Sequence, residues 1–470
     1  MENNLTNGKG QIERRLVVVG IFDDTIVAVS SAQGRAGVGV VRVSGSLSRH
    51  ICINMSGLSP QKNQFFYSGL RNNSGQVIDS GIVLFFEGPN SYTGEDIVEF
   101  QAHGNPIILK DIVTRAVELG ARQARPGEFT ERSFRNGKIS LDQAEAVADL
   151  IAGQTKRATL SAARTLTGLF AIKVNSILTS IRESLFQIEA SIDFHEDLDP
   201  HSLTESLKRA AVEQKEKLKE LISKAEVGIR LKEGVFVTIV GSPNVGKSTL
   251  LNKLAGSDKA IVSDVPGTTR DPVEITIDVS GIPVHFVDTA GIRDTSDQIE
   301  ATGIERTKIE AEKSDIILYL HEEGVSCDDG ILIEKLRKLS DNLTGDIVLV
   351  RNKIDLLEME SGVSNTGEVK HVNISAYSGR GINTLLNTLL ELMVPSDSKE
   401  DEFVARERHL NSLRKTFEIL RNVSFDLLNC SPELVAEEYR QACRELDLIS
   451  GRYTTEELLG DIFSRFCIGK

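Results

Sequence analysis

Gly241-Ser-Pro-Asn-Val-Gly246-Lys247-Ser248 decides the fold of the central part of this chain. The stretch fits the pattern G-x-x-x-x-G-K-[ST], follows the apolar segment 235–240 and precedes a helical pattern. In this arrangement the glycines permit a tight loop whose main-chain N–H groups surround phosphate groups. Lys247 is expected to reach the β- and γ-phosphates, and Ser248 is expected to ligate Mg²⁺. The alternative is a chance glycine-rich turn, and the strand before the loop and the helix after it argue against that alternative.

Apolar segments alternate with helical patterns from Gly234 onward. Such alternation predicts a doubly wound parallel sheet with helices on both faces. The expected strands cover residues 235–240, 284–287, 316–320, 347–351 and 369–375. We therefore predict an α/β phosphate-binding domain over residues 234–396.

Two further motifs concern the metal and the γ-phosphate. Residues 267–271 read Gly-Thr-Thr-Arg-Asp, and Thr269 is suited to be a second hydroxyl ligand of Mg²⁺. Asp288-Thr-Ala-Gly291 ends an apolar strand. Its carboxylate can hold the metal shell, and its glycine can place an N–H group on the γ-phosphate.

The motifs that follow select the base. Asn352-Lys353-Ile-Asp355 ends the expected strand at 347–351, and Ser375-Ala376 follows the next one. The Asp355 carboxylate can accept hydrogen bonds from guanine N1–H and the exocyclic amine, a donor pair that adenine lacks. The order and spacing of all these motifs predict a Ras-like GTPase domain. The residues predicted to bind GTP are Asn244, Val245, Gly246, Lys247, Ser248, Thr249, Ser263, Thr268, Thr269, Asp288, Thr289, Ala290, Gly291, Asn352, Lys353, Asp355, Ser375 and Ala376.

The group that orients the attacking water is not at its usual place. Ras-like enzymes carry Gln directly after D-x-x-G, but this chain has Ile292, whose apolar side chain cannot orient water. A carboxylate in the following loop is the expected substitute. Four carboxylates are candidates for this role, and the sequence does not choose among them: Asp294, Asp297, Glu300 and Glu305.

The flanks of the GTPase domain predict two other kinds of structure. Strand-like stretches at 25–29, 38–43 and 82–86, with a helix at 107–119, indicate a mixed α/β domain. From residue 139, apolar residues recur at helical spacing, with long helices expected over 166–188 and 203–232, and this periodicity returns after residue 404. The simplest interpretation is one helical domain interrupted by the GTPase domain, and two separate helical domains are the alternative. Residues 1–21 are set aside as an N-terminal extension.

Composition limits the class of protein. The chain has 470 residues, a formal net charge of -14 and a pI of about 5.2. Its length predicts roughly three domains, and its charge argues against non-specific coating of nucleic acid. No apolar run approaches a membrane span. The five cysteines are scattered without metal-ligand spacing, which favours a cytoplasmic location.

Several motifs outside the GTPase set resemble those of the MnmE (TrmE) family of tRNA modification GTPases. They are Asp24-Thr-Ile-Val-Ala, Gly34-Arg-Ala-Gly-Val-Gly39, Ser91-Tyr-Thr-Gly-Glu-Asp96, Ala124-Arg-Pro-Gly-Glu-Phe-Thr-Glu-Arg132, Leu141-Asp-Gln-Ala-Glu-Ala146 and Phe466-Cys-Ile-Gly-Lys470. The resemblance implies a folate-binding-like, dimerising domain over 22–137, a helical domain over 138–233 and 397–470, and the GTPase domain between them. It also implies an FAD-dependent partner, MnmG (GidA), in a heterotetramer. The two proteins together would form 5-carboxymethylaminomethyluridine, or its aminomethyl form, at the tRNA wobble position.

The resemblance extends to a folate site. It places Arg42, Glu99, Lys138 and Lys470 at the family's folate-contacting positions, for 5-formyl- or methylene-tetrahydrofolate. Arg and Lys suit the glutamyl carboxylates of folate, and Glu suits the pterin amine and ring N–H. A surface charge is the alternative for Arg42 or Lys138 taken alone. Cys467 matches a terminal cysteine that the family needs for modification, and an apolar tail residue packed against helices is the alternative.

The resemblance also implies that K⁺ takes the place of an arginine finger and promotes pairing of two GTPase domains. The implied K⁺ ligands are Asn244, Ser263, Val265 and Thr268, with Ser263 standing where close relatives have Thr. Glu300 matches the family's water-orienting glutamate, which selects it among the four carboxylates. Two other functions stay open: a GTP-driven assembly switch of the Era type, and a folate-dependent aminomethyltransferase acting alone.

Overall fold

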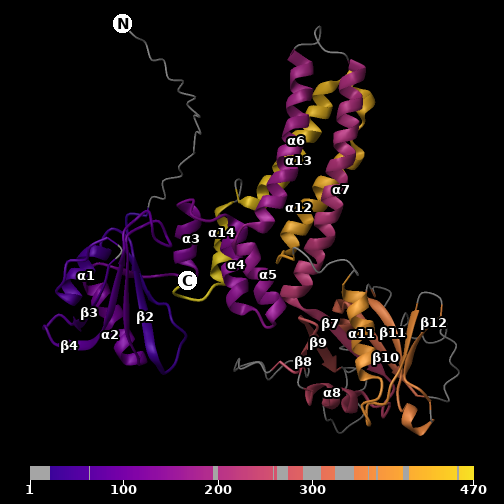
Figure 1. The fold of residues 1–470 in the computed structure, drawn as a ribbon, viewed down its shortest axis with the longest axis horizontal. Helices are drawn as coiled ribbons and strands as arrows, with labels where there is room; N and C mark the ends of the chain where they lie inside the picture. Colours follow the sequence, from indigo (N-terminus) through magenta and orange to yellow (C-terminus); the bar gives the residue numbers. More distant parts are fainter. Residues whose placement is uncertain are drawn as a thin grey trace, which may run out of the picture. The chain divides into compact units, whose positions relative to one another are not determined.

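The computed structural model of the protein describes residues 22–470, except 63, 194–199, 258, 262–273, 289–307, 323–342, 344, 358, 367–368, 395–401 and 452–454. The predicted extension, residues 1–21, lies outside this part. Contacts divide the chain into two units: Met1–Glu145 with Ser450–Lys470 (unit 1), and Ala146–Ile449 (unit 2). The domain limits expected at residues 22, 138, 234 and 397 stay predictions. Figure 1 shows the elements of both units.

Unit 1 contains a six-stranded sheet in the order β3-β4-β5-β2-β1-β6. Its strands are β1 (Ile26–Val29), β2 (Ala36–Ser44), β3 (Gln64–Arg71), β4 (Val77–Phe86), β5 (Ile97–Gly104) and β6 (Arg122–Gln123). Helices α1 (Ser48–Ser56) and α2 (Pro106–Glu118) cover one face and enclose an apolar core around Val41, Val83 and Phe100. The predicted elements at 25–29, 38–43, 82–86 and 107–119 are confirmed as β1, β2, β4 and α2, while α1, β3, β5 and β6 were not predicted.

Among the described residues, α3 (Glu128–Arg135) and Tyr92 cover the other face of this sheet near β1 and β2. There, Phe129 of α3 packs against Ile26 and Ala28. At the opposite edge, Phe65 and Tyr67 of β3 are about three-quarters exposed. Helix α14 (Glu456–Ser464) and the tail segment, residues 466–470, complete unit 1.

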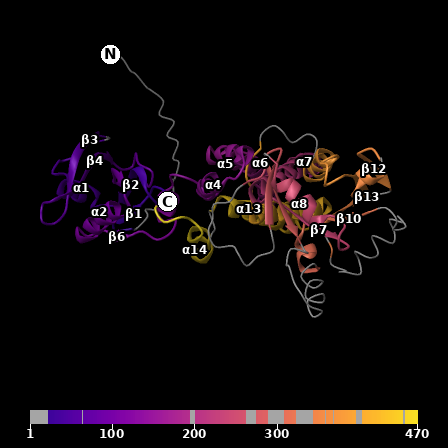
Figure 2. The same ribbon diagram turned by 90° about the horizontal axis from the view of Figure 1, so that it is seen from below.

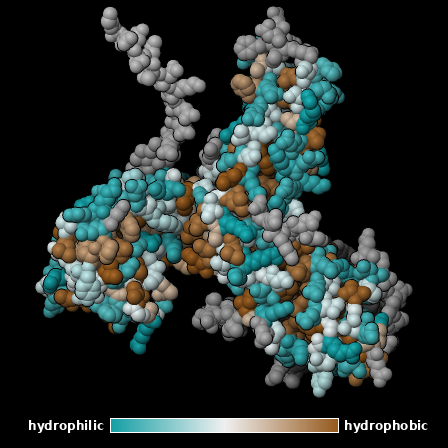
Figure 3. Space-filling view, viewed as in Figure 1, coloured by the Kyte–Doolittle hydropathy of each residue, from teal (hydrophilic) through white to brown (hydrophobic). Residues whose placement is uncertain are grey.

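Unit 2 begins with helices that share one core across a long gap in sequence. The helices are α4 (Leu141–Ala152), α5 (Lys156–Leu166), α6 (Leu169–Asp193), α7 (Pro200–Glu233), α12 (Glu407–Asn422), η2 (Phe425–Asn429) and α13 (Pro432–Ser450), of which α4 and α13 cross the limits of the unit. Residues from 170–225 and from 403–449 pack into the same apolar cluster. Figures 1 and 2 show α6, α7 and α13 running side by side, and hydrophilic residues cover much of their outward surface in Figure 3. The finding supports one helical domain interrupted by the α/β segment.

The α/β segment of unit 2 forms a seven-stranded sheet in the order β12-β13-β11-β10-β7-β9-β8. Its elements are β7 (Val235–Gly241), α8 (Lys247–Ala255), β8 (Glu274–Val279), β9 (Ile282–Asp288), β10 (Ile316–His321), β11 (Asp346–Arg351), η1 (Ile354–Leu356), β12 (Gly362–Thr366), β13 (Val369–Asn373) and α11 (Ile382–Met393). Alternate residues of the central strands enter two apolar clusters, one on each face, because the sheet is buried on both sides.

The predicted fold class is confirmed: an α/β N-terminal part, a helical part and a doubly wound α/β part. The prediction of a purely parallel sheet is wrong at the two edges, where β8 and β12 pair antiparallel to their neighbours. β12 reads Gly-Val-Ser-Asn-Thr and has little apolar periodicity. β8 alternates at Ile275, Ile277 and Val279, a pattern of an antiparallel strand that the sequence analysis did not use. Within the described residues, no helix is long and apolar enough to cross a membrane.

Candidate functional site

The phosphate-binding loop lies between the end of β7 and the start of α8. Gly246 caps α8 with a φ of 104°, and Asn244 also has a positive φ of 64°. The Lys247 side chain is buried, and its Nζ donates to the main-chain oxygens of Gly241 at 2.7 Å and Ser242 at 3.0 Å. Ser248 and Thr249 are exposed at the first turn of α8. The helix N-terminus and the lysine therefore meet at the loop, as phosphate binding requires.

Asn352 joins three of the predicted motifs. Its Nδ2 donates to the oxygen of Val245 at 2.9 Å, and its Oδ1 accepts from the N–H of Ala376 at 2.9 Å. A Cβ at Gly246 would lie 2.3 Å from Asn352 Nδ2, so only glycine permits this close approach. The structure thus brings the phosphate loop and both base-selecting motifs together at one end of the sheet.

The surroundings of the Asp355 carboxylate show whether it could accept hydrogen bonds from a guanine base. Its Oδ1 is buried and, among the described residues, has no hydrogen-bond partner. Buried carboxylate oxygens normally accept hydrogen bonds, so an unpartnered one is suited to the donors of a bound base. Beside it, Lys353 has a φ of 64° and pairs with Glu322 at 2.5 Å. Ser375 is buried, and its hydroxyl accepts from the N–H of Ser378.

Part of the predicted nucleotide site falls outside the described residues. Asp288 is the last residue of β9 and pairs with Ile239 of β7, which places its main chain next to the strand that leads into the phosphate loop. The remaining predicted positions lie in the segments that the structure does not describe: Ser263, Val265, Thr268, Thr269, Thr289, Ala290, Gly291, Glu300 and the alternatives Asp294, Asp297 and Glu305. The metal and water-orienting roles of these residues therefore stay predictions.

The predicted folate residues Arg42 and Glu99 face each other on neighbouring strands of unit 1. They are directly opposed in the β2–β5 pair, and Arg42 Nε lies 2.8 Å from Glu99 Oε1. The Arg42 side chain is 19% exposed and the Glu99 side chain 16%, which argues against an ordinary surface charge at Arg42. The Arg42 guanidinium also lies 5.6 Å from the ring centre of Tyr92 and 5.7 Å from that of Phe129.

Lys470 and Cys467 are bound through their main chains to α3 and to the residue before it. The Phe129 N–H donates to the main-chain oxygen of Lys470 at 3.2 Å, and the Gly127 N–H donates to that of Cys467 at 3.4 Å. The Cys467 side chain is exposed, so the alternative of a packed tail residue is wrong for this side chain; Phe466 is the packed one. Lys138 is exposed, and its Nζ donates to the oxygen of Pro89 at 2.8 Å.

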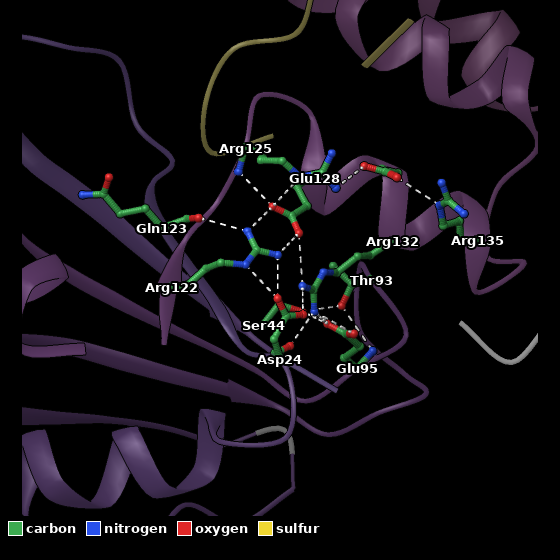
Figure 4. Close-up of polar contacts among 11 residues, drawn as sticks. Asp24, Ser44, Thr93, Glu95, Arg122, Gln123, Arg125, Glu128, Arg132 and Arg135 are labelled. Carbon is green, nitrogen blue, oxygen red and sulfur yellow. Dashed lines mark hydrogen bonds and ion pairs between the residues drawn. The ribbon is translucent and has the colours of Figure 1, made fainter. Parts of the chain in front are cut away.

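An ion-pair network lies under α3 (Figure 4). Glu128 is fully buried and accepts from Arg122 Nη1 and Nη2 at 2.8 and 2.5 Å, and from Arg132 Nη2 at 3.2 Å. Arg132, also fully buried, donates further to Asp24 Oδ1 at 2.7 Å and to Glu95 Oε1 at 3.1 Å. Burial raises the pKa of the Glu128 carboxyl, but hydrogen bonds from Arg122, the Arg125 N–H and Arg132 outweigh it and lower the pKa to about 2.

Sequence reasoning gave no role to the ring residues Tyr92 and Phe129 or to this network. One signal was available for the network, since charged residues recur at steps of three and four. They are Arg122, Arg125, Glu128, Glu131, Arg132 and Arg135. That spacing also fits a solvated helix face, and only the structure shows that Glu128 and Arg132 are buried.

Comparisons with known proteins cover nearly the whole chain. A family model described as the GTP-binding protein TrmE N-terminus matches residues 25–138, and one described as the MnmE helical domain matches residues 141–467. The curated relative "tRNA modification GTPase MnmE" from Laribacter hongkongensis is 41% identical over 452 residues, covering 95% of this chain and 99% of its own. Proteins of the same name from Coxiella burnetii and Pseudomonas aeruginosa are 39% and 42% identical, covering 96% and 95% of this chain and 99% of each relative. A solved structure of Era from Aquifex aeolicus aligns with 40% of this chain and 68% of its own at 26% identity, with a TM-score of 0.26, too low to bear on the fold.

Proposed function

The chain belongs to the MnmE (TrmE) family of tRNA modification GTPases, and on that premise we propose that it couples GTP hydrolysis to folate-dependent modification of the tRNA wobble uridine. Membership confirms the predicted enzyme class, a GTP hydrolase, and the predicted role in tRNA modification. It also favours the modification enzyme over an assembly switch of the Era type. The finer steps below are proposals.

The buried, unpartnered Asp355 Oδ1 is the observation that carries specificity for GTP. We assign it the guanine N1–H and exocyclic amine, with Lys247 turning from its loop carbonyls to the β- and γ-phosphates. The exposed Ser248 hydroxyl is the first Mg²⁺ ligand and Thr269 the second. Mg²⁺ would neutralise charge on the phosphates.

Hydrolysis is proposed to depend on K⁺ and on Glu300. Ile292 cannot orient the attacking water, and Asn244 lies exposed in the phosphate loop, where its side-chain oxygen can serve a cation. The other ligands would come from the segment with Ser263, Val265 and Thr268.

Two experiments test these roles. Replacing K⁺ by Na⁺ should slow hydrolysis strongly without loss of nucleotide binding. The variant Glu300→Gln should keep its affinity for GTP while its kcat collapses. Equal rates in both salts would reject the cation, and normal turnover of the variant would reject Glu300.

The folate site is proposed around Arg42, Glu99, Lys138 and Lys470. The Arg42–Glu99 pair lies next to two aromatic rings, so a ligand there would meet charged groups and flat apolar surfaces together. Arg42, Lys138 and Lys470 suit the glutamyl carboxylates, and Glu99 suits the pterin amine. Titration calorimetry with 5-formyltetrahydrofolate tests the site, and wild-type protein that does not bind would overturn it. Cys467, exposed on the same tail, is proposed to act in modification.

A homodimer is proposed to form through the open part of the unit 1 sheet. Phe65 opposes Leu84, and Tyr67 opposes Ile82, so these apolar side chains share the face that carries Glu99 and Arg42. An exposed apolar face of this kind is typical of an interface, and a second copy would also enclose the folate site. Tyr67→Lys should shift the sedimentation coefficient toward that of a monomer; an unchanged dimer would place the interface elsewhere.

The proposed partners are an FAD-dependent protein of the MnmG (GidA) type, in a heterotetramer, and tRNA, in the cytoplasm. The described cysteines are free, which is compatible with a reducing compartment. Nucleoside analysis of tRNA from cells lacking the protein is the decisive experiment. Loss of the wobble modification, restored by wild type but not by Glu300→Gln, would support both the function and its coupling to hydrolysis. Unchanged nucleosides would overturn the proposal.

A further inference from the structure

Helix α3 connects the tail segment to the rest of unit 1. The Gly127 and Phe129 N–H groups donate to Cys467 and Lys470, and Pro126 forms a bridge with Ile468. A Cβ at Gly127 would lie 2.7 Å from the oxygen of Phe463, so the segment leading to the tail approaches α3 too closely for any side chain there. The position of Cys467 and Lys470 therefore depends on the position of α3.

The same helix holds the loop that carries Tyr92. The Tyr92 hydroxyl lies 2.9 Å from Thr130 Oγ1, and Ser133 Oγ donates to the oxygen of Tyr92 at 2.8 Å. Asn136 Nδ2, directly after the helix, donates to the oxygen of Thr93 at 2.7 Å. Both rings beside Arg42 are thus placed by α3: Phe129 belongs to it, and Tyr92 is bonded to it.

Apolar packing does little to fix α3. Its eight residues read Glu-Phe-Thr-Glu-Arg-Ser-Phe-Arg, and of the six that are buried only Phe129 is apolar. The remaining attachment is polar, and its innermost part is the Glu128 carboxylate between Arg122 and Arg132. Figure 4 shows these side chains converging beneath the helix with Asp24 and Glu95. Removing one partner of such a buried set leaves an uncompensated charge, which disturbs the position of the helix.

We propose that Glu128 and Arg132 are positioning residues of the folate site, acting through α3 on Phe129, Tyr92 and the tail segment. This inference rests on the folate site proposed above. Neither residue needs to touch the ligand: the network fixes the helix, and the helix holds the two rings beside Arg42 and binds the main chain of the tail segment. Loss of the Glu128 charge should therefore weaken folate binding while the nucleotide site of unit 2 continues to work.

The test compares Glu128→Gln with wild type and with Glu87→Gln. Glu87 pairs with Arg49 in the same unit, but both side chains are more than a third exposed, so this variant controls for loss of an ion pair as such. For Glu128→Gln we expect the dissociation constant of 5-formyltetrahydrofolate to rise about tenfold or more, and amide exchange of Gly127 and Phe129 to accelerate. GTP hydrolysis should stay at the wild-type rate. Glu128→Asp, which keeps the charge, should recover part of the affinity.

The outcomes separate the two proposals. Wild-type folate affinity and wild-type amide protection in Glu128→Gln would overturn the positioning role. Wild-type protein that binds no folate would overturn the proposed site, while the amide exchange would still report whether the network holds the tail. If Glu128→Gln does not fold, Arg122→Gln serves instead, since it removes the two hydrogen bonds from the partly exposed Arg122 to the Glu128 carboxylate. A smaller loss of affinity, about two- to fivefold, is expected there, and none would again overturn the role.

Discussion

The two sites of this protein are built from different parts of the chain. The described nucleotide site of unit 2 lies in short contiguous segments, in which the side chains of Lys247 and Asn352 bind main-chain groups of the neighbouring loops. The proposed folate site of unit 1 combines side chains of β2, β5 and α3 with the tail segment, which follows α3 by more than 300 residues in sequence. A site built from contiguous segments depends on a few residues within those segments, whereas a site built from distant elements depends on the position of every element that contributes to it.

The largest effect is expected for Lys247→Ala. Its ammonium group is the one predicted to meet the β- and γ-phosphates, and loss of a group that stabilises developing charge typically costs about 100-fold or more in rate. Steady-state GTP hydrolysis measures the loss. Lys253→Ala, an exposed lysine of the same helix α8, is the control and should behave as wild type. Folate binding should be unchanged in both; a parallel loss of folate affinity would mean that the two sites are not independent.

Asn352→Ala should have the next largest effect. The change removes the bonds to Val245 and Ala376, and each buried group left without a partner costs about 1–3 kcal/mol. We expect GTP affinity to fall about tenfold or more and the melting temperature to drop by several degrees. Fluorescent-nucleotide titration and calorimetry check this, with the exposed Asn365 of β12 as the control position. Unaltered affinity would show that the base loops keep their positions without this residue.

The same contrast explains what the sequence could predict. The loop from Gly241 to Ser248 and the Asn352 motif are contiguous, so spacing alone identified them and the strands that carry them. The contact of Arg42 with Phe129 joins positions far apart, and no local pattern indicates it. The family resemblance gave Arg42 a role, but it gave none to Phe129, which it only included in a motif. Burial of Glu128 and Arg132 was unpredictable for a similar reason, because charges at helical spacing are usually solvated.

Arg42→Gln tests the folate site directly. The change keeps a polar side chain but removes the charge that pairs with Glu99, and charge-assisted hydrogen bonds contribute about 1.5–3 kcal/mol. Folate affinity should fall about tenfold, and GTP hydrolysis should not change. Arg71→Gln, on the exposed part of β3, is the control. Equal affinities for the two variants would indicate that the ligand binds away from the β2–β5 pair.

The smallest effect expected is the pH dependence of α3, and it tests whether ion pairs hold this helix in place. The Glu128 pKa is lowered from 4.5 to about 2 in the folded protein, so its contribution to stability is present above about pH 4.5 and is lost as the pH falls toward 2. Arg122, Arg132, the Arg125 N–H and the nearby Asp24 face this carboxyl. The pKa of Asp24 is lowered as well: partial burial raises it, but bonds from Arg122 and Arg132 outweigh the burial.

Amide protection in β1 and α3 should therefore fall between about pH 5 and about pH 3 in wild type, by at most about 1.4 kcal/mol per pH unit for each carboxyl. In Glu128→Gln protection should be lower at pH 5 but depend less on pH, since the carboxyls of Asp24 and Glu456 remain. Parallel curves for the two proteins would mean that the Glu128 carboxylate contributes no pH-dependent stability to α3. The helix would then be held by the packing of Phe129 and by its main-chain bonds to the tail segment.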